Sequence, residues 1–188
     1  MKVKLGISNR HIHLNKETCD LLFGEDYKLT IKNNLLQPGE YSANETLTIK
    51  TNKDEIRNVR IIGPLRPYSQ VEISKTDSYK LGINPPLRDS NNLIDSEDIT
   101  LISNLKEVKL TNACVISTRH IHMNNIDALK YGLKNNDKVS IKVEGIKPGI
   151  LGNVNIKVKD NYVLELHLDT DDANAFLLNN NDELEVII

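Results

Sequence analysis

The sequence predicts a mainly β protein, built from small β-barrels with short α-helices at their corners. Many short segments with alternating apolar residues indicate strands, and turns rich in Asn, Asp and Gly separate them. The helical segments are too few and too short to cover both faces of a parallel sheet. Small barrels of short strands, capped by short helices, agree with both observations.

Two copies of one motif, 109 residues apart, hold four of the five histidines. Residues 8–14 read Ser-Asn-Arg-His-Ile-His-Leu, and residues 117–123 read Ser-Thr-Arg-His-Ile-His-Met. A strand-like apolar run precedes each copy, at residues 3–7 and 113–116. The sequence therefore predicts that each histidine pair directly follows a strand.

A short helix is expected after each copy of the motif. Asn15 and Asn124 are suited to cap the start of such a helix. Gly24 and Gly132 are suited to end it, because glycine accommodates the left-handed conformation found at helix ends.

A second repeat lies in the C-terminal half of the chain. Residues 127–141 align without gaps on residues 172–186, and both segments predict a short helix, an Asn/Asp turn and a strand. Residues 77–83 resemble the helical part of this repeat.

The other strand candidates are residues 45–50, 58–62, 70–74, 138–143, 154–158 and 163–168. Duplication of the chain with two-fold-like docking would bring the two histidine pairs to one interface.

Size and composition limit the kinds of function. A chain of 188 residues can form one large domain or two small ones. The 24 basic and 26 acidic residues nearly cancel, which disfavours nucleic-acid binding, and no apolar run is long enough to cross a membrane. Cys19 and Cys114 do not suggest a disulfide framework, and the first strand follows Met1-Lys2 without room for a signal peptide. We therefore expect a cytoplasmic protein.

The His-x-His pairs predict metal binding. Side chains at positions i and i+2 of a strand lie on one face, so each pair can close on a single ion. With His167, the five histidines exceed the ligands that one zinc ion usually takes, so two ions are expected. A carboxylate should complete the set, and Glu72 and Asp169 are the candidates; Asp169 could instead orient an imidazole.

Other polar residues in these segments have weaker signals. Arg66 lies close to Glu72 in the sequence, and an arginine beside a metal makes a site for an anion such as phosphate. Arg10 and Arg119 precede the histidine pairs and fit a packing and surface role as well as a functional one. Cys19 and Cys114 are best interpreted as small buried side chains.

Six segments together resemble one known family, the zinc-dependent phosphate propanoyltransferases of propanediol utilisation. They are Arg-His-Ile-His-Leu at 10–14, Leu-Leu-Gln-Pro-Gly at 35–39, Gly-Pro-Leu-Arg at 63–66, Gln-Val-Glu-Ile-Ser at 70–74, Arg-His-Ile-His-Met at 119–123 and Leu-Glu-Leu-His-Leu-Asp-Thr-Asp-Asp-Ala-Asn-Ala at 164–175. The resemblance extends from Val3 to about Ala175 and keeps the family's order of motifs.

The resemblance implies two small β-barrels with short helical caps and an interleaved chain path. One barrel would contain residues 1–9 and 118–188, and the other residues 10–117 with a helical excursion. It also implies two zinc ions per chain in an active site at the barrel interface. One ion would bind His11, His13 and Glu72. The other would bind His120, His122 and His167.

The resemblance also implies the substrates. Acyl-coenzyme A (acetyl or propanoyl) and inorganic phosphate would be interconverted with acyl phosphate and coenzyme A. Arg66 would be the catalytic residue that binds phosphate, and Arg60, Tyr79 and Asn174 would lie near the coenzyme A pocket. Family members destined for microcompartments carry an N-terminal extension; the chain begins at its first strand, so we do not expect association with a shell.

Two other functions share the same ligands. A dinuclear zinc hydrolase of thioesters would activate water in place of phosphate. A structural zinc module that binds a partner protein would usually have closed, cysteine-rich sites, unlike this histidine-rich set. The sequence is compatible with a homo-oligomer.

Overall fold

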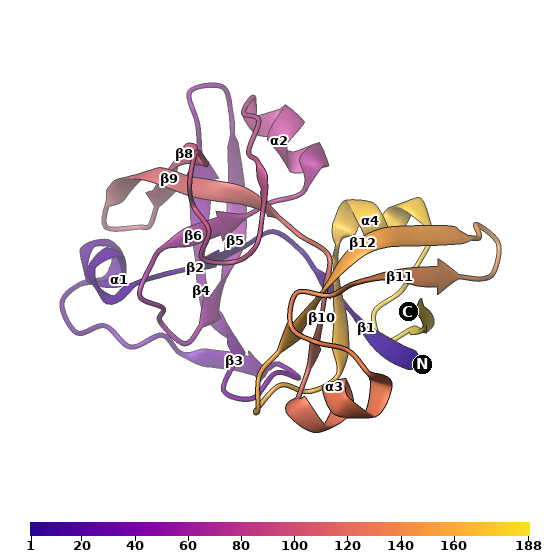
Figure 1. Cartoon of the computed structure of the whole chain (residues 1–188). Coiled ribbons are helices and arrows are strands. Elements are labelled where there is room, and N and C mark those ends of the chain that lie inside the picture. The colour runs from indigo at the N-terminus through magenta and orange to yellow at the C-terminus, as the bar shows by residue number, and fades with distance from the viewer. The chain divides into compact units, whose positions relative to one another are not determined.

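The chain is mainly β, as the sequence predicts. The computed structural model describes residues 1–188, with fourteen strands and four short helices. It divides into two compact units, one formed by Met1–Asn9 with Thr118–Ile188 and the other by Arg10–Ser117. Each unit has its own closed barrel of six strands (Figure 1).

The barrel of the discontinuous unit takes one strand from the N-terminus and five from the C-terminal part of the chain. In order around the barrel, its strands are β1 (Lys2–Ser8), β13 (Glu165–Asp169), β10 (His120–Met123), β12 (Gly149–Val158), β11 (Lys138–Val143) and β14 (Glu183–Ile187). Alternate residues of these strands point inward and form a core that includes Leu5, Ile121 and Leu166. Burial of these apolar side chains holds the barrel together.

The barrel of the continuous unit is closed in the same way. In order around the ring, its strands are β4 (Tyr41–Lys50), β5 (Glu55–Gly63), β2 (His11–His13), β6 (Gln70–Glu72), β9 (Glu107–Ser117) and β8 (Glu97–Ile102), and β8 pairs with β4. The short strands β3 (Ile31–Asn34) and β7 (Leu87–Arg88) pair with β4 and β9. Ile12, Ile61 and Val71 belong to its fully buried core.

The chain crosses between the units at the two copies of the histidine motif. Strand β1 belongs to the discontinuous unit, whereas β2 begins three residues later in the continuous one. At the second copy, β9 belongs to the continuous unit and β10 to the discontinuous one. Each histidine pair therefore begins a strand in a different unit from the strand before it.

The four helices begin at capped positions. Helix α1 (Lys16–Phe23) is capped by Asn15, and α3 (Asn125–Tyr131) by Asn124, as predicted. Ser74 caps α2 (Lys75–Leu81) in a reciprocal capping box with Asp77. Asp169 caps α4 (Thr170–Ala175) by accepting a hydrogen bond from the backbone of Asp172.

The helix ends follow the sequence prediction at one glycine and depart from it at the other. Gly132 adopts the left-handed conformation, with φ 67° and ψ 26°. Gly24 also ends its helix, but its φ of 105° and ψ of 158° form an extended positive-φ conformation that glycine adopts most readily. Both segments of the second repeat form a helix followed by a strand, α3 with β11 and α4 with β14.

No helix combines the length and apolar character needed to cross a membrane.

Candidate metal centres

The first group of metal-ligating side chains lies on two neighbouring strands of the continuous unit. His11 and His13 occupy alternate positions of β2, and Glu72 ends β6. The two strands are antiparallel, and His11 lies directly opposite Glu72. This register brings the ligand atoms of all three side chains within 4.8 Å of one another.

The distances in this group fit a bound metal ion. His11 Nε2 and His13 Nε2 lie 3.2 Å apart, and Glu72 Oε2 lies 3.5 Å from His11 Nε2. Two ligands of a tetrahedral zinc ion are separated by about 3.3 Å when each bond is 2.0–2.1 Å long. The separation of the two imidazole nitrogens is therefore compatible with a shared metal ion.

Hydrogen bonds set the chemical state of this group. The His13 Nδ1 hydrogen donates to the carbonyl oxygen of Ile62 at 3.0 Å, which leaves the lone pair on Nε2. Gln70 Nε2 donates to Glu72 Oε1 at 2.7 Å, and the Ser90 hydroxyl lies 3.2 Å from the same oxygen. These hydrogen bonds therefore orient the imidazole of His13 and the carboxylate of Glu72 as potential metal ligands.

Burial favours the neutral form of His13, and neighbouring charges favour the carboxylate form of Glu72. Burial, followed by the charges of His11 and Arg66, lowers the pKa of His13 to about 3. For Glu72, burial alone would raise the pKa, but the neighbouring imidazoles and the Arg66 guanidinium outweigh it and lower the pKa. At neutral pH the group offers a neutral imidazole at His13 and a carboxylate at Glu72, as a metal requires.

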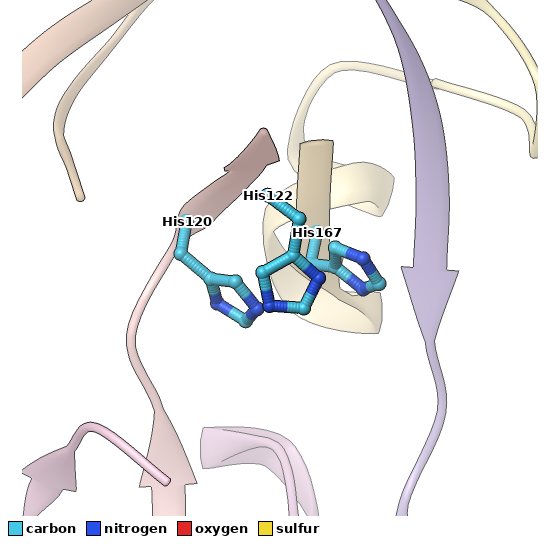
Figure 2. Close-up of side chains that lie close together, drawn as sticks. All are labelled: His120, His122 and His167. Carbon is cyan, nitrogen blue, oxygen red and sulfur yellow. The ribbon is translucent and has the colours of Figure 1, made fainter. Parts of the chain in front are cut away.

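The second group lies in the discontinuous unit and has the same register. His120 and His122 occupy alternate positions of β10, and His120 lies directly opposite His167 of β13. Figure 2 shows the three rings gathered together, and their ligand atoms also lie within 4.8 Å of one another. The rings of His120 and His167 are stacked, with centroids 4.9 Å apart, and Tyr162 stacks on His122.

The second group also fits a metal ion. The His120 Nδ1 hydrogen donates to the carbonyl oxygen of Thr118 at 2.8 Å, which leaves the lone pair on Nε2. Burial, and then the charge of Lys157, lower the pKa of His120 well below its ordinary value. His167 Nε2 is buried and makes no hydrogen bond. Three imidazoles on one face of two paired strands, two of them buried, match the histidine-rich ligand sets typical of catalytic zinc.

Arg66 lies close enough to the first group to act on it electrostatically. Its guanidinium lowers the pKa values of both His13 and Glu72. Its own contacts are Glu40 Oε1 at 3.1 Å and the Tyr68 hydroxyl at 3.2 Å. It is a partly exposed cation beside a candidate metal centre, which is a suitable arrangement for binding an anion.

The three residues expected near the coenzyme A pocket lie on three different elements, β5, α2 and α4. Arg60 is opposite His11 in the β2–β5 ladder and donates to the carbonyl oxygens of Ala43 and Asn44. Tyr79 is 68% exposed on α2, where Lys75 lies over its ring. Asn174 is exposed on α4.

The structure assigns definite partners to the two arginines that precede the histidine pairs. Arg10 makes a two-pronged ion pair with Asp77, with both N–O distances 2.7 Å. Arg119 makes the same pair with Asp172, again at 2.7 Å. Asp169, considered as a ligand or as a partner of an imidazole, is the cap of α4 instead.

The cysteines are buried and free, and burial raises the pKa of each thiol. Neither Cys19 nor Cys114 therefore supplies a thiolate at neutral pH.

Two polar residues of these sites carry no role in the sequence prediction. Gln70 and Glu165 each lie two residues before the third ligand of a group, Glu72 or His167, and each contacts that ligand. The alternation of side chains on a strand could have indicated both, because positions i and i+2 share a face. Only the cross-strand register shows that this face is the one with the histidines.

Comparison with known proteins now gives the family. The model of the phosphate propanoyltransferase family matches residues 4–179, which is nearly the whole chain. The chain belongs to this family.

Individual relatives agree with this assignment. The chain is 45% identical to the phosphate propanoyltransferase of Thermotoga maritima over 184 residues, covering 97% of the chain and 88% of that protein. It is 45% identical to the Salmonella typhimurium enzyme of the same name over 174 residues, covering 92% and 82%. It is 46% identical to the Priestia megaterium enzyme over 180 residues, covering 96% and 83%.

Proposed function

We propose that the chain is a phosphotransacylase that interconverts an acyl-coenzyme A and phosphate with an acyl phosphate and coenzyme A. The proposal is supported above all by its membership of the phosphate propanoyltransferase family over nearly its full length. We further propose acetyl- or propanoyl-coenzyme A as the substrate; the relatives are named for transfer of the propanoyl group.

The reaction would use two zinc ions per chain. His11, His13 and Glu72 would hold one ion, and His120, His122 and His167 the other. When bound, zinc supplies a Lewis acid that can hold phosphate or polarise the thioester carbonyl. The two ligand groups support the proposal because each brings three ligand atoms within 4.8 Å of one another, and catalytic zinc sites use three protein ligands with a fourth position for water or substrate.

Arg66 would bind the phosphate. Its guanidinium now contacts the carboxylate of Glu40, and a phosphate oxygen can replace that carboxylate as its partner. A planar guanidinium that holds phosphate by two hydrogen bonds orients one oxygen towards the thioester carbon. A carbon–oxygen bond then forms, the carbon–sulfur bond breaks, and coenzyme A leaves as the thiolate.

Coenzyme A would contact Arg60, Tyr79 and Asn174. The exposed side chains on α2 and α4 are accessible to a ligand, and Arg60 offers a cation to the phosphates of the coenzyme. We also propose that the protein works in the cytoplasm, where a reducing environment suits two buried free cysteines.

Thioester cleavage with and without phosphate tests the proposal. The zinc-loaded protein should release free thiol from propanoyl-coenzyme A only when phosphate is present. Equal release without phosphate would indicate a thioester hydrolase that uses the same ligands to activate water. No release in either condition, with zinc bound, would indicate a structural metal module.

A further inference from the structure

The two candidate metal centres are built from the same two kinds of segment, and the spacing of residues within each segment is the same. Each contains an arginine, a His-x-His pair, a third ligand, a helix cap two residues after that ligand, and an aspartate five residues after it. In the continuous unit the last three are Glu72, Ser74 and Asp77; in the discontinuous unit they are His167, Asp169 and Asp172. In both, the third ligand lies directly opposite the first histidine of the pair.

This correspondence pairs Gln70 with Glu165. Gln70 lies opposite His13, and Glu165 lies opposite His122, so each faces the second histidine of its pair. Each also lies two residues before the third ligand on the same strand face. The two residues therefore occupy equivalent places in the two centres.

The side chains at these equivalent places have opposite hydrogen-bonding roles, and each role suits the ligand beside it. The Gln70 amide is a hydrogen-bond donor, and it donates to Glu72, a ligand that can only accept. Glu165 is an acceptor, and its Oε2 lies 3.0 Å from Nε2 of His167, a ligand that can donate. Donor and acceptor are exchanged, but in each centre this side chain contacts the third ligand.

The space for Glu165 is also specific to its centre. Gly6 lies beside His167 in the β1–β13 ladder, and a Cβ placed on Gly6 would come within 2.6 Å of Glu165 Oε1. The equivalent residue of the other centre, beside Glu72 in the β6–β9 ladder, is Val115. Only the centre with the glutamate has a glycine here, so its backbone leaves room for the carboxylate.

We propose that Glu165 is the positioning residue of the three-histidine centre, and this inference rests on the proposed metal binding. Its carboxylate accepts the Nε2 hydrogen of His167 and leaves Nδ1 for the ion. In this structure Nε2 of His167 lies 3.0 Å from Glu165 Oε2 without a well-aligned hydrogen bond, so the proposal includes a small rotation of the ring when the ion binds. A carboxylate on the far nitrogen of a ligating imidazole fixes its tautomer and increases its basicity.

The exchange of Glu165→Gln tests this role through metal affinity. Zinc binding to the whole chain is measured by competition with a chelator. Circular dichroism verifies that each variant is folded. One of two sites should weaken by about 10- to 100-fold, while the other keeps its affinity. Glu183→Gln is the matched control, because Glu183 is an exposed residue of the same barrel and should change neither site.

Gly6→Ala is a second variant that should disrupt the contact between Glu165 and His167. The added methyl group meets only the flexible end of the Glu165 side chain, so it should displace the carboxylate without unfolding the barrel. It should weaken the same site. Because both changes remove one contact, the double variant should bind zinc about as well as Glu165→Gln alone.

Nitrogen-15 NMR of the His167 ring identifies the role directly. In the zinc-loaded protein, Nε2 should carry the proton and Nδ1 should bind the ion. An ion on Nε2, or unchanged zinc affinity in both Glu165→Gln and Gly6→Ala, would overturn the inference. A wild-type chain that binds no zinc would instead overturn the proposed metal function itself.

Discussion

At the scale of single residues, Arg66 carries the prediction most specific to phosphate. Arg66→Lys keeps the charge but loses the planar pair of donors. The Michaelis constant for phosphate should rise about tenfold, since a charge-assisted hydrogen bond contributes about 1.5–3 kcal/mol. The constant for acyl-coenzyme A and the zinc content should change little. Unaltered phosphate kinetics would leave Arg66 as a partner of Glu40 alone.

The buried histidines predict how the chelator-treated protein responds to acid. Burial lowers the pKa of His13 to about 3, so between about pH 6.5 and 3 the unfolded chain binds a proton that the folded chain does not. The free energy of unfolding should therefore fall as the pH drops below 6.5, by at most about 1.4 kcal/mol per pH unit for this residue. His13→Gln should make the fall less steep in urea unfolding; an equal slope would contradict the assignment.

At the scale of secondary structure, the paired arginines tie a histidine strand to a helix in each unit. Arg10 holds Asp77 of α2, and Arg119 holds Asp172 of α4. Each pair joins segments more than fifty residues apart in the chain, beside a third ligand. The ion pairs thus connect each helix to the residue directly before a histidine strand.

A double-mutant cycle on Arg119 and Asp172 measures the coupling energy of this ion pair. Arg119→Met combined with Asp172→Asn should give a coupling energy of about 1 kcal/mol, because the pair is two-pronged but partly exposed. The exposed pair Lys142 and Glu144 in the same unit is the control and should couple by less than half as much. Equal coupling for both pairs would show that the Arg119 contact is an ordinary surface ion pair.

Local sequence patterns predicted the strands and helix caps well, because they depend on near neighbours. Asn15 and Asn124 cap helices, and the histidine pairs occupy alternate strand positions. The pairing of His11 with Glu72 across 61 residues depends on strand register, which no local pattern encodes. For the same reason the sequence did not indicate that Glu165 faces His122.

At the scale of the whole molecule, the two ligand groups predict the metal content. The purified chain, after expression with ample zinc, should contain about two zinc ions by elemental analysis, one for each group of three ligands. His167→Ala should remove or weaken one and spare the other, because the groups lie in separate barrels. One ion or none in the wild-type chain would contradict the two-site proposal.

The products of the reaction test the central claim most directly. Zinc-loaded protein is incubated with propanoyl-coenzyme A and phosphate, and free thiol and acyl phosphate are measured in the same sample. Direct transfer of the acyl group to phosphate predicts one acyl phosphate for each thiol released. Thiol released without acyl phosphate would contradict the account, because it would show that water accepts the acyl group.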